Sequence, residues 1–454
     1  MAEKLRSRDW LILLSGIFII LSTLILFLPL ENGAKFFLIA SGAVFLFSLL
    51  NYRWGLFIFL FLRPLIDFAT EQKLFSVGSV TVNLLFVFGG LMLLFSLLVL
   101  GANYRELKER KIFSLWLLFI AWSFISLVYS FDLLSSVKEL SRYLSIFFSF
   151  ALGAMLIKKS RDLTQLIKVI IFSSLIPAAV ALGQYVSGNG LIEDGINRLY
   201  GTMAHPNMLA FYLLLPITLS VFIFLTVDKK RLEAYLYLAI ALFLSFILVY
   251  TYTRGAYVAL LLIFILIGSL KYRKFLAVAG IGLVLFYIAS STFQQRFNTI
   301  FQSDPYGSIT WRISLYRDSF SYVMLSPIIG QGVGLAETII ATNRDFRLGA
   351  TQPHNDYMRL ALDGGIVGVV LYLLLIAVLF FELIRLYKLE NRTRLKMLNI
   401  FILAFTVSLY AMSIGDNILN DTTLEWQFWA LIGGLLATQV IKKPAISERA
   451  AKVD

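Results

Sequence analysis

Residues 82–100 read VNLLFVFGGLMLLFSLLVL, nineteen residues without a single charge. About twenty apolar residues in a helix are needed to cross the hydrocarbon core of a bilayer. Comparable stretches occupy 10–30, 208–226 and 366–381. Because 59% of the 454 residues are hydrophobic and 40 are phenylalanine, the chain is too apolar for an ordinary soluble domain. The sequence predicts an all-α integral membrane protein.

Apolar stretches of this kind recur along the whole chain and predict a polytopic bundle of about 12–14 transmembrane helices. An even number of crossings is favoured, and the segment 54–65 is the weakest candidate. The first stretch is followed by no small-residue cleavage site, so we expect it to remain as an anchor. The chain has no cysteine, which excludes disulfides and thiolate chemistry. Residues 1–454 are therefore interpreted as a single integral membrane domain.

The net charge of +13 is spread over short connections between spans. Basic residues follow alternate spans, at 4–8, 105–111, 158–161, 229–231, 271–274, 385–396 and 442–443. By the positive-inside rule these connections and both termini face the cytoplasm, while the acidic turn 416–425 faces the other side. A nucleic-acid partner is not expected, because that needs one concentrated basic patch. Membrane lipids are the expected surroundings.

One long hydrophilic insertion, residues 292–364, interrupts the apolar pattern and is predicted to face outward as a folded lid with amphipathic helices. Ile313, Tyr316, Phe320 and Met324 recur at helical spacing, which predicts an amphipathic helix over 311–325, lying on the bilayer surface or over a cavity and ended by Pro327. The insertion holds six arginines and no lysine, at 296, 312, 317, 344, 347 and 359. Arginine binds phosphate in two-point geometry. Most of the six are expected to pair with acids of the insertion, and about two to act on a ligand.

The two histidines of the chain stand in the motifs Ala204-His205-Pro206-Asn207 and Pro353-His354-Asn355-Asp356, each beside a predicted span. Histidine is the side chain best suited to proton transfer near neutral pH. The alternative is that Asn and Pro merely cap the helices that follow. Neither histidine has acidic or cysteine partners at metal-ligand spacing, so no metal and no cofactor are expected.

Four polar segments fall on the predicted outer side: 198–207, 251–256, 311–312 and 352–359. Arg254 lies in a tight turn between two apolar spans, where a charge is tolerated if it faces a cavity or an anionic ligand. The alternative for Arg254 is snorkelling to the membrane interface. The glycine pattern at 330–334 lacks the flanking strand and helix of a nucleotide site and is interpreted as a flexible turn.

In this order the motifs resemble the superfamily of O-antigen ligases and O-antigen polymerases, glycosyltransferases of the bacterial envelope. The resemblance rests on RLYGTMAHPN at 198–207, TRGA at 253–256, PIIGQG at 327–332 and PHNDY at 353–357 ahead of Gly364-Gly365. It covers about residues 190–380.

The resemblance implies a metal-independent, inverting transfer of a glycan from an undecaprenyl-diphosphate carrier to an acceptor hydroxyl. The reaction would take place on the outer face of the inner membrane. By the motifs, His354 would be the base and Arg198 and Arg254 would bind the diphosphate. Arg312 would be a third phosphate contact. His205, Asn207, Asn355 and Asp356 are candidates for orienting the substrate.

Three alternatives remain open from the sequence. A ligase would transfer the glycan to the lipid A core, whereas a polymerase would join it to a second lipid-linked glycan. The arginine-rich insertion slightly favours the ligase. A polysaccharide flippase or other transporter would instead need charged or broken-helix sites near mid-membrane, often in two similar halves. The polar residues here concentrate at one membrane face, which favours an enzyme.

Overall fold

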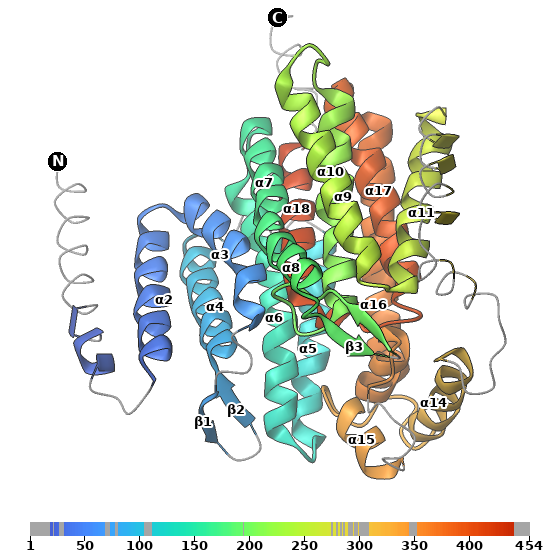
Figure 1. The fold of residues 1–454 in the computed structure, drawn as a ribbon. Coiled ribbons are helices and arrows are strands. Elements are labelled where there is room, and N and C mark those ends of the chain that lie inside the picture. The colour runs from blue at the N-terminus through green and yellow to red at the C-terminus, as the bar shows by residue number, and fades with distance from the viewer. Residues whose placement is uncertain are drawn as a thin grey trace, which may run out of the picture.

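The computed structural model describes residues 31–439 except 69–72, 78–79, 104–110, 194, 345–351 and most of 274–307, together with 19–20 and 22–26. The described part is 82% helical with almost no sheet (Figure 1). Eight of its helices are long and apolar enough to cross a membrane. This confirms the all-α polytopic fold. The total of 12–14 spans remains a prediction, since most of 10–30 and 274–307 lies outside the described residues.

The helices run in chain order as follows: α2 (Asn32–Leu50), α3 (Tyr52–Ile66), α4 (Leu84–Asn103), α5 (Lys111–Ile125), α6 (Leu133–Leu156), α7 (Ser160–Ser173), α8 (Leu175–Ser187), α9 (Pro206–Thr226), α10 (Leu232–Tyr250), α11 (Arg254–Leu270), α14 (Ser308–Val323), α15 (Ala336–Asn343), α16 (Asp356–Leu389), α17 (Thr393–Met412) and α18 (Thr422–Thr438). Short 3-10 turns, η3 (Ser126–Tyr129) and η5 (Ile418–Asn420), precede α6 and α18. Two antiparallel hairpins, β1 (Lys73–Val77) with β2 (Val80–Asn83) and β3 (Leu191–Glu193) with β4 (Ile196–Arg198), connect helices.

Helices α9 and α18 form the centre of the bundle. Both are predominantly apolar and buried on nearly every face, as expected for helices that are surrounded by other helices. Helix α18 contacts α6 backbone to backbone: a Cβ on Gly153 would lie 2.1 Å from the Ala430 carbonyl oxygen, and one on Gly433 2.2 Å from that of Phe150. Small residues at such positions allow close helix packing within membranes. The tight centre fixes the α17–α18 connection that enters the functional site.

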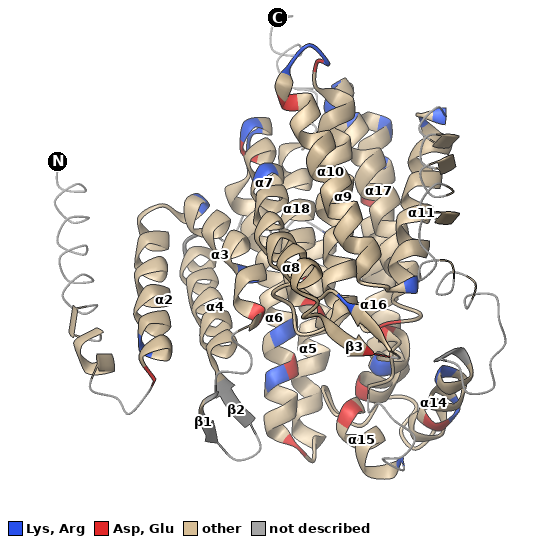
Figure 2. Cartoon of the chain, in the orientation of Figure 1, with Lys and Arg blue, Asp and Glu red and all other residues tan. Residues whose placement is uncertain are grey.

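The two ends of the bundle differ in charge (Figure 2). The end with the α9–α10 connection and the start of α7 carries exposed basic residues, including Lys229 and Lys230. The opposite end, where α14 and α15 lie, carries acidic and basic residues together. This agrees with the predicted pattern in which basic residues follow alternate spans. That the basic end faces the cytoplasm stays a prediction.

The amphipathic helix predicted over 311–325 corresponds to α14. Three of the four residues of its predicted apolar stripe, Ile313, Phe320 and Met324, are each more than half exposed, whereas Tyr316 is half-buried and packs on the protein. The packed face also uses Leu315, which is buried against α15 and α16. The three exposed residues are therefore free to meet a bilayer surface. The lid as a whole, 292–364, stays a prediction because 345–351 and most of 292–307 lie outside the described residues.

Candidate functional site

Four connections meet at the end of the bundle opposite the basic loops. They are residues 198–207, 251–254, 352–356 and 413–421, and they lead into α9, α11, α16 and α18. All four helices start at this end, so the positive ends of their dipoles point toward it. Such an arrangement favours an anionic ligand.

Arg198 is the hub of the first two connections and is buried, with 7% of its surface exposed. Its Nε donates to the Thr251 carbonyl (2.8 Å), and its Nη2 donates to Asn207 Oδ1 (2.8 Å) and Thr253 Oγ1 (3.1 Å). Its Nη1 pairs with Glu193. Four of the five guanidinium N–H groups are thus engaged by protein acceptors, and the side chain holds the start of α9 beside the start of α11.

His205 and Asn207 extend this network. His205 is the N-cap of α9, and its Nδ1 accepts a hydrogen bond from the Asn207 backbone N–H at 3.1 Å. The Asn207 amide points the other way and donates to Asp416 Oδ2 at 3.0 Å. His205 itself therefore caps α9. Asn207 bridges the arginine hub to the α17–α18 connection.

Asp416 links this hub to His354. The distance between His354 Nδ1 and Asp416 Oδ1 is 3.5 Å, long for a hydrogen bond, while the Asn417 N–H donates to the same oxygen at 2.9 Å. With a proton on Nδ1 facing the carboxylate, the other ring nitrogen, Nε2, keeps its lone pair and can accept a proton. A carboxylate in this position holds the imidazole orientation and stabilises the imidazolium form. The pair has the parts of a general base.

The backbone at His354 is in the left-handed region, with φ of 48°. Among the described residues only Tyr252, φ 52°, is another non-glycine residue with positive φ, and it stands just before Thr253 and Arg254. This conformation costs an L-residue on the order of 1–3 kcal/mol and persists where its surroundings impose it. Here the Tyr316 hydroxyl donates to the His354 carbonyl (2.9 Å), and the Asn355 N–H donates to Asn417 Oδ1 (3.2 Å).

Helix α14 covers His354. The Trp311 ring meets the imidazole edge to face with centroids 5.7 Å apart. Arg312 is half-buried, its charge lowers the pKa of Asp416, and its Nε is buried without a hydrogen bond to any described residue. A guanidinium nitrogen in that state is suited to an incoming anion. Burial raises the pKa of Tyr316, so its hydroxyl stays protonated and able to donate.

The electrostatics of the site follow from these contacts. Burial alone would raise the pKa of Asp416, but the hydrogen bond and charge of His354, the Asn417 N–H and Arg312 outweigh it and hold this pKa below its ordinary value. Burial, followed by the charge of Arg198, lowers the pKa of His205. Asp416 is therefore ionised and His205 neutral near pH 7.

The remaining predicted residues lie around this cluster. Arg254 is the first residue of α11, half-buried, and its N-cap Thr253 bonds Arg198. Asn355 caps α16 by accepting from the Met358 N–H at 3.0 Å. Asp356 is fully buried and accepts from the Leu419 N–H at 3.2 Å. Asn355 and Asp356 therefore hold the start of α16 against the 413–421 connection, which is a structural role.

Sequence reasoning did not identify Asp416 and Asn417 as site residues. The signal available was an Asp-Asn pair in a short acidic turn between two spans, on the side already assigned to the polar motifs. Only packing of α17 beside α16 shows that this turn faces His354. Of the other lid arginines, Arg344 pairs with Asp318 of the insertion at 2.9 Å, as expected. Arg359 instead pairs mainly with Glu139 of α6 (2.5 Å), outside the insertion, and more distantly with Asp363 (3.9 Å). Arg296 and Arg347 lie outside the described residues.

The glycine segment 330–334 is packed against α16, which corrects its interpretation as a flexible turn. The Gln331 N–H donates to the Leu362 carbonyl (2.8 Å) and the Gly332 N–H to the Asp363 carbonyl (3.0 Å). It fits into a break in α16 at Gly365, φ 62°, where an added Cβ would lie 2.3 Å from the Ile328 carbonyl oxygen. The segment therefore sets the direction in which α16 presents its N-terminus.

Residues 238–373 match the model of a protein family described as O-antigen ligase. The matched region holds Arg254, Arg312, His354, Asn355 and Asp356. It ends before Asp416 and begins after Arg198.

Among curated proteins, one of Rickettsia conorii (strain ATCC VR-613 / Malish 7) named "Putative polysaccharide ligase" is 25% identical over 349 residues. The aligned region covers 73% of this chain and 80% of that protein. Together the two findings support the O-antigen ligase family that the motifs indicated, and an O-antigen ligase-like activity in general.

Proposed function

We propose that the protein transfers a glycan from an undecaprenyl-diphosphate carrier to a hydroxyl of the lipid A core. The reaction would occur on the outer face of the bacterial inner membrane, with both chain termini in the cytoplasm. The observation that carries this proposal is the His354–Asp416 pair beside Arg312, at the end of the bundle that lacks the basic loops. The family comparisons support a ligase of this general type.

His354 is proposed as the general base. Asp416 holds the Nδ1 proton, so Nε2 takes the proton of the acceptor hydroxyl as its oxygen attacks the anomeric carbon. The bond from that carbon to the carrier diphosphate breaks, and its electron pair leaves with the diphosphate. Attack opposite the leaving group inverts the anomeric configuration. The ionised Asp416 stabilises the imidazolium that forms.

Arg312 and Arg254 are proposed to hold the diphosphate. The leaving group gains negative charge as the bond breaks, so fixed guanidinium groups stabilise the transition state more than the substrate. Removing one such donor typically costs about 2.7–4 kcal/mol of activation free energy. Arg198 has one N–H left for the ligand, and its main proposed role is to hold the wall formed by the starts of α9 and α11.

The test is a gel analysis of surface glycans and carrier-linked glycans in a host that lacks the protein. The host is complemented with the natural chain, with His354→Ala or with Arg317→Gln, an exposed arginine on α14 that serves as the control. A ligase is indicated if, without the protein, long glycan accumulates on the carrier and none reaches the lipid A core. Arg317→Gln should rescue transfer and His354→Ala should not.

Other outcomes assign the alternatives. Loss of long chains with continued transfer of single repeats would identify a polymerase. Disappearance of outward-facing carrier-linked glycan would identify a flippase. Full rescue by His354→Ala at normal protein level would overturn the role of the base.

A further inference from the structure

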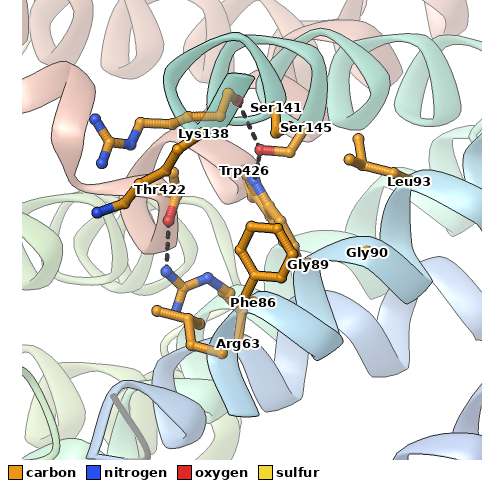
Figure 3. A pocket seen from close by; sticks show the side chains of 12 residues that line it. Arg63, Phe86, Gly89, Gly90, Leu93, Lys138, Ser141, Ser145, Thr422 and Trp426 are labelled. Atoms are coloured by element: carbon orange, nitrogen blue, oxygen red, sulfur yellow. Dashed lines mark hydrogen bonds between the residues drawn. The ribbon is translucent and has the colours of Figure 1, made fainter. Parts of the chain in front are cut away.

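A cavity of about 160 Å³ lies between α4 and α6 (Figure 3). Its lining includes Thr422, which directly follows the 413–421 connection. Its lining is formed by α4, α6, Arg63 from α3 and the first turns of α18. The cationic residues lining it are Arg63, Lys138 and Arg142, and no acid lines it among the described residues. The mechanism proposed above uses none of these residues.

The three cations differ in how far they are already engaged. Arg63 is buried, paired with Asp67 at 2.5 Å, bonded to Thr422 and stacked on Trp426 at 5.5 Å, so it is part of the wall. Arg142 uses Nη1 for Glu139 and for Asn420 Oδ1 (2.8 Å).

No described residue accepts a hydrogen bond from the other nitrogens of Arg142, and Lys138 is exposed with no described acceptor. One ammonium and one guanidinium edge are thus left for a ligand. Both lie within about three helical turns of the α6 start, roughly 15 Å at 1.5 Å per residue.

The opposite wall is apolar and unusually open. A Cβ added to Gly89 or Gly90 of α4 would meet no atom within 4 Å. The exposed apolar surface continues along α4, with Leu94 at 46% and Leu97 at 57% exposed. Figure 3 shows Lys138 and Ser141 on the α6 side and Gly89 and Gly90 on the α4 side of the same space. A ligand with its charged headgroup between α6 and α18 would therefore place its apolar chain along α4.

We propose that this cavity binds an anionic phospholipid, with its phosphate on Lys138 and Arg142 and an acyl chain over Gly89 and Gly90. A zwitterionic headgroup fits less well, because the lining offers only serine and threonine hydroxyls, and no carboxylate, to an ammonium. The cavity adjoins the 413–421 connection, which carries Asp416, because Arg142 bonds Asn420 and Arg63 bonds Thr422. A bound lipid would steady the segment that carries Asp416.

The probe is phosphatidylglycerol, counted per protein by native mass spectrometry after reconstitution with phosphatidylcholine as competitor. Lys138→Gln removes one phosphate contact without removing a described protein contact and should weaken retention about fivefold. Gly90→Leu occupies the apolar wall and should also displace the lipid, while leucine suits a helix better than glycine. Arg317→Gln is the control that removes one cation outside the cavity and should retain lipid as the natural chain does.

Three results would overturn the proposal: equal retention of phosphatidylcholine, natural retention by both Lys138→Gln and Gly90→Leu, or one-for-one displacement by a polyprenyl diphosphate, which would assign the cavity to the donor. Melting temperatures of all variants separate loss of lipid from loss of fold. Because the readout is binding, it stands whether or not the proposed transfer activity does.

Discussion

The polar residues of the candidate site fall into two groups, one around Arg198 and one formed by His354 and Arg312. The two groups differ in how completely their hydrogen bonds are satisfied. Arg198 is buried and bonded to Thr251, Asn207, Thr253 and Glu193, so nearly all its donors are used. In the second group, His354 has one long contact to Asp416, and Arg312 has a buried Nε with no described acceptor. A satisfied buried ion builds a scaffold, whereas an unsatisfied one is costly unless a ligand completes it. This difference supports the proposal that Arg198 has a structural role and that His354 and Arg312 act on the substrate.

The largest loss of activity is expected at Asp416, which links the two groups through Asn207 and His354. Asp416→Asn can still accept from Asn207 but loses the negative charge that stabilises imidazolium. Transfer should fall by about 10²–10⁴-fold at unchanged protein level. The rate of glycan transfer in membranes from matched expression tests this. Asp318→Asn is a control on α14, since Asp318 pairs with Arg344. Near-natural activity of Asp416→Asn would remove Asp416 from the mechanism.

Arg312→Gln should come next. Loss of one donor to a developing charge lowers the transfer rate by about 10²–10³-fold. Thermal stability should change little, because the variant loses the attraction between Arg312 and Asp416 but also removes a buried Nε that bonds no described residue. The comparison variant is Arg317→Gln, which removes an exposed arginine from the same helix. If both variants lose activity equally, α14 contributes only general charge.

Arg198→Gln should instead act through stability. Several hydrogen bonds to a charged group are lost together, each worth about 1.5–3 kcal/mol, so the melting temperature in detergent should drop markedly. Arg198→Lys should not restore it, since an ammonium cannot reproduce the fork that reaches Thr251 and Asn207. A stable Arg198→Gln protein that fails only in donor binding would return Arg198 to the diphosphate role predicted from the sequence.

The smallest effect concerns pH and His205. Its pKa is lowered by folding, so its contribution to stability is present above its unfolded pKa of about 6.5 and is lost as pH falls through the folded pKa. Protonation removes the Nδ1 lone pair that caps α9. His205→Asn keeps a capping oxygen without a titration, so melting temperature should fall less between pH 7.5 and 5.5 than in the natural chain. The cap is worth about 1 kcal/mol. Identical pH profiles would show that the cap does not depend on titration of His205.

The sequence determined the class of the protein and indicated most residues of its candidate site. Uncharged runs such as 82–100 require a bilayer, because their backbone and side chains are stable there as helices. The polar motifs around His205, Arg254 and His354 stand out because a membrane chain places polar residues only where they act or meet water. Counting the predicted spans between these motifs places all of them at the same end of the bundle.

Only the tertiary structure decided which of these residues work together. Asp416 is 62 residues from His354 and 209 from Asn207, and no local pattern links them. Their contact depends on α17 returning beside α16 and on the close packing of α18 against α6. Whether an arginine is satisfied or free is likewise a property of the packed neighbourhood, as Arg198 and Arg312 show. Periodicity and composition act along the chain, whereas the partners of a buried charge are set by which helices meet across it.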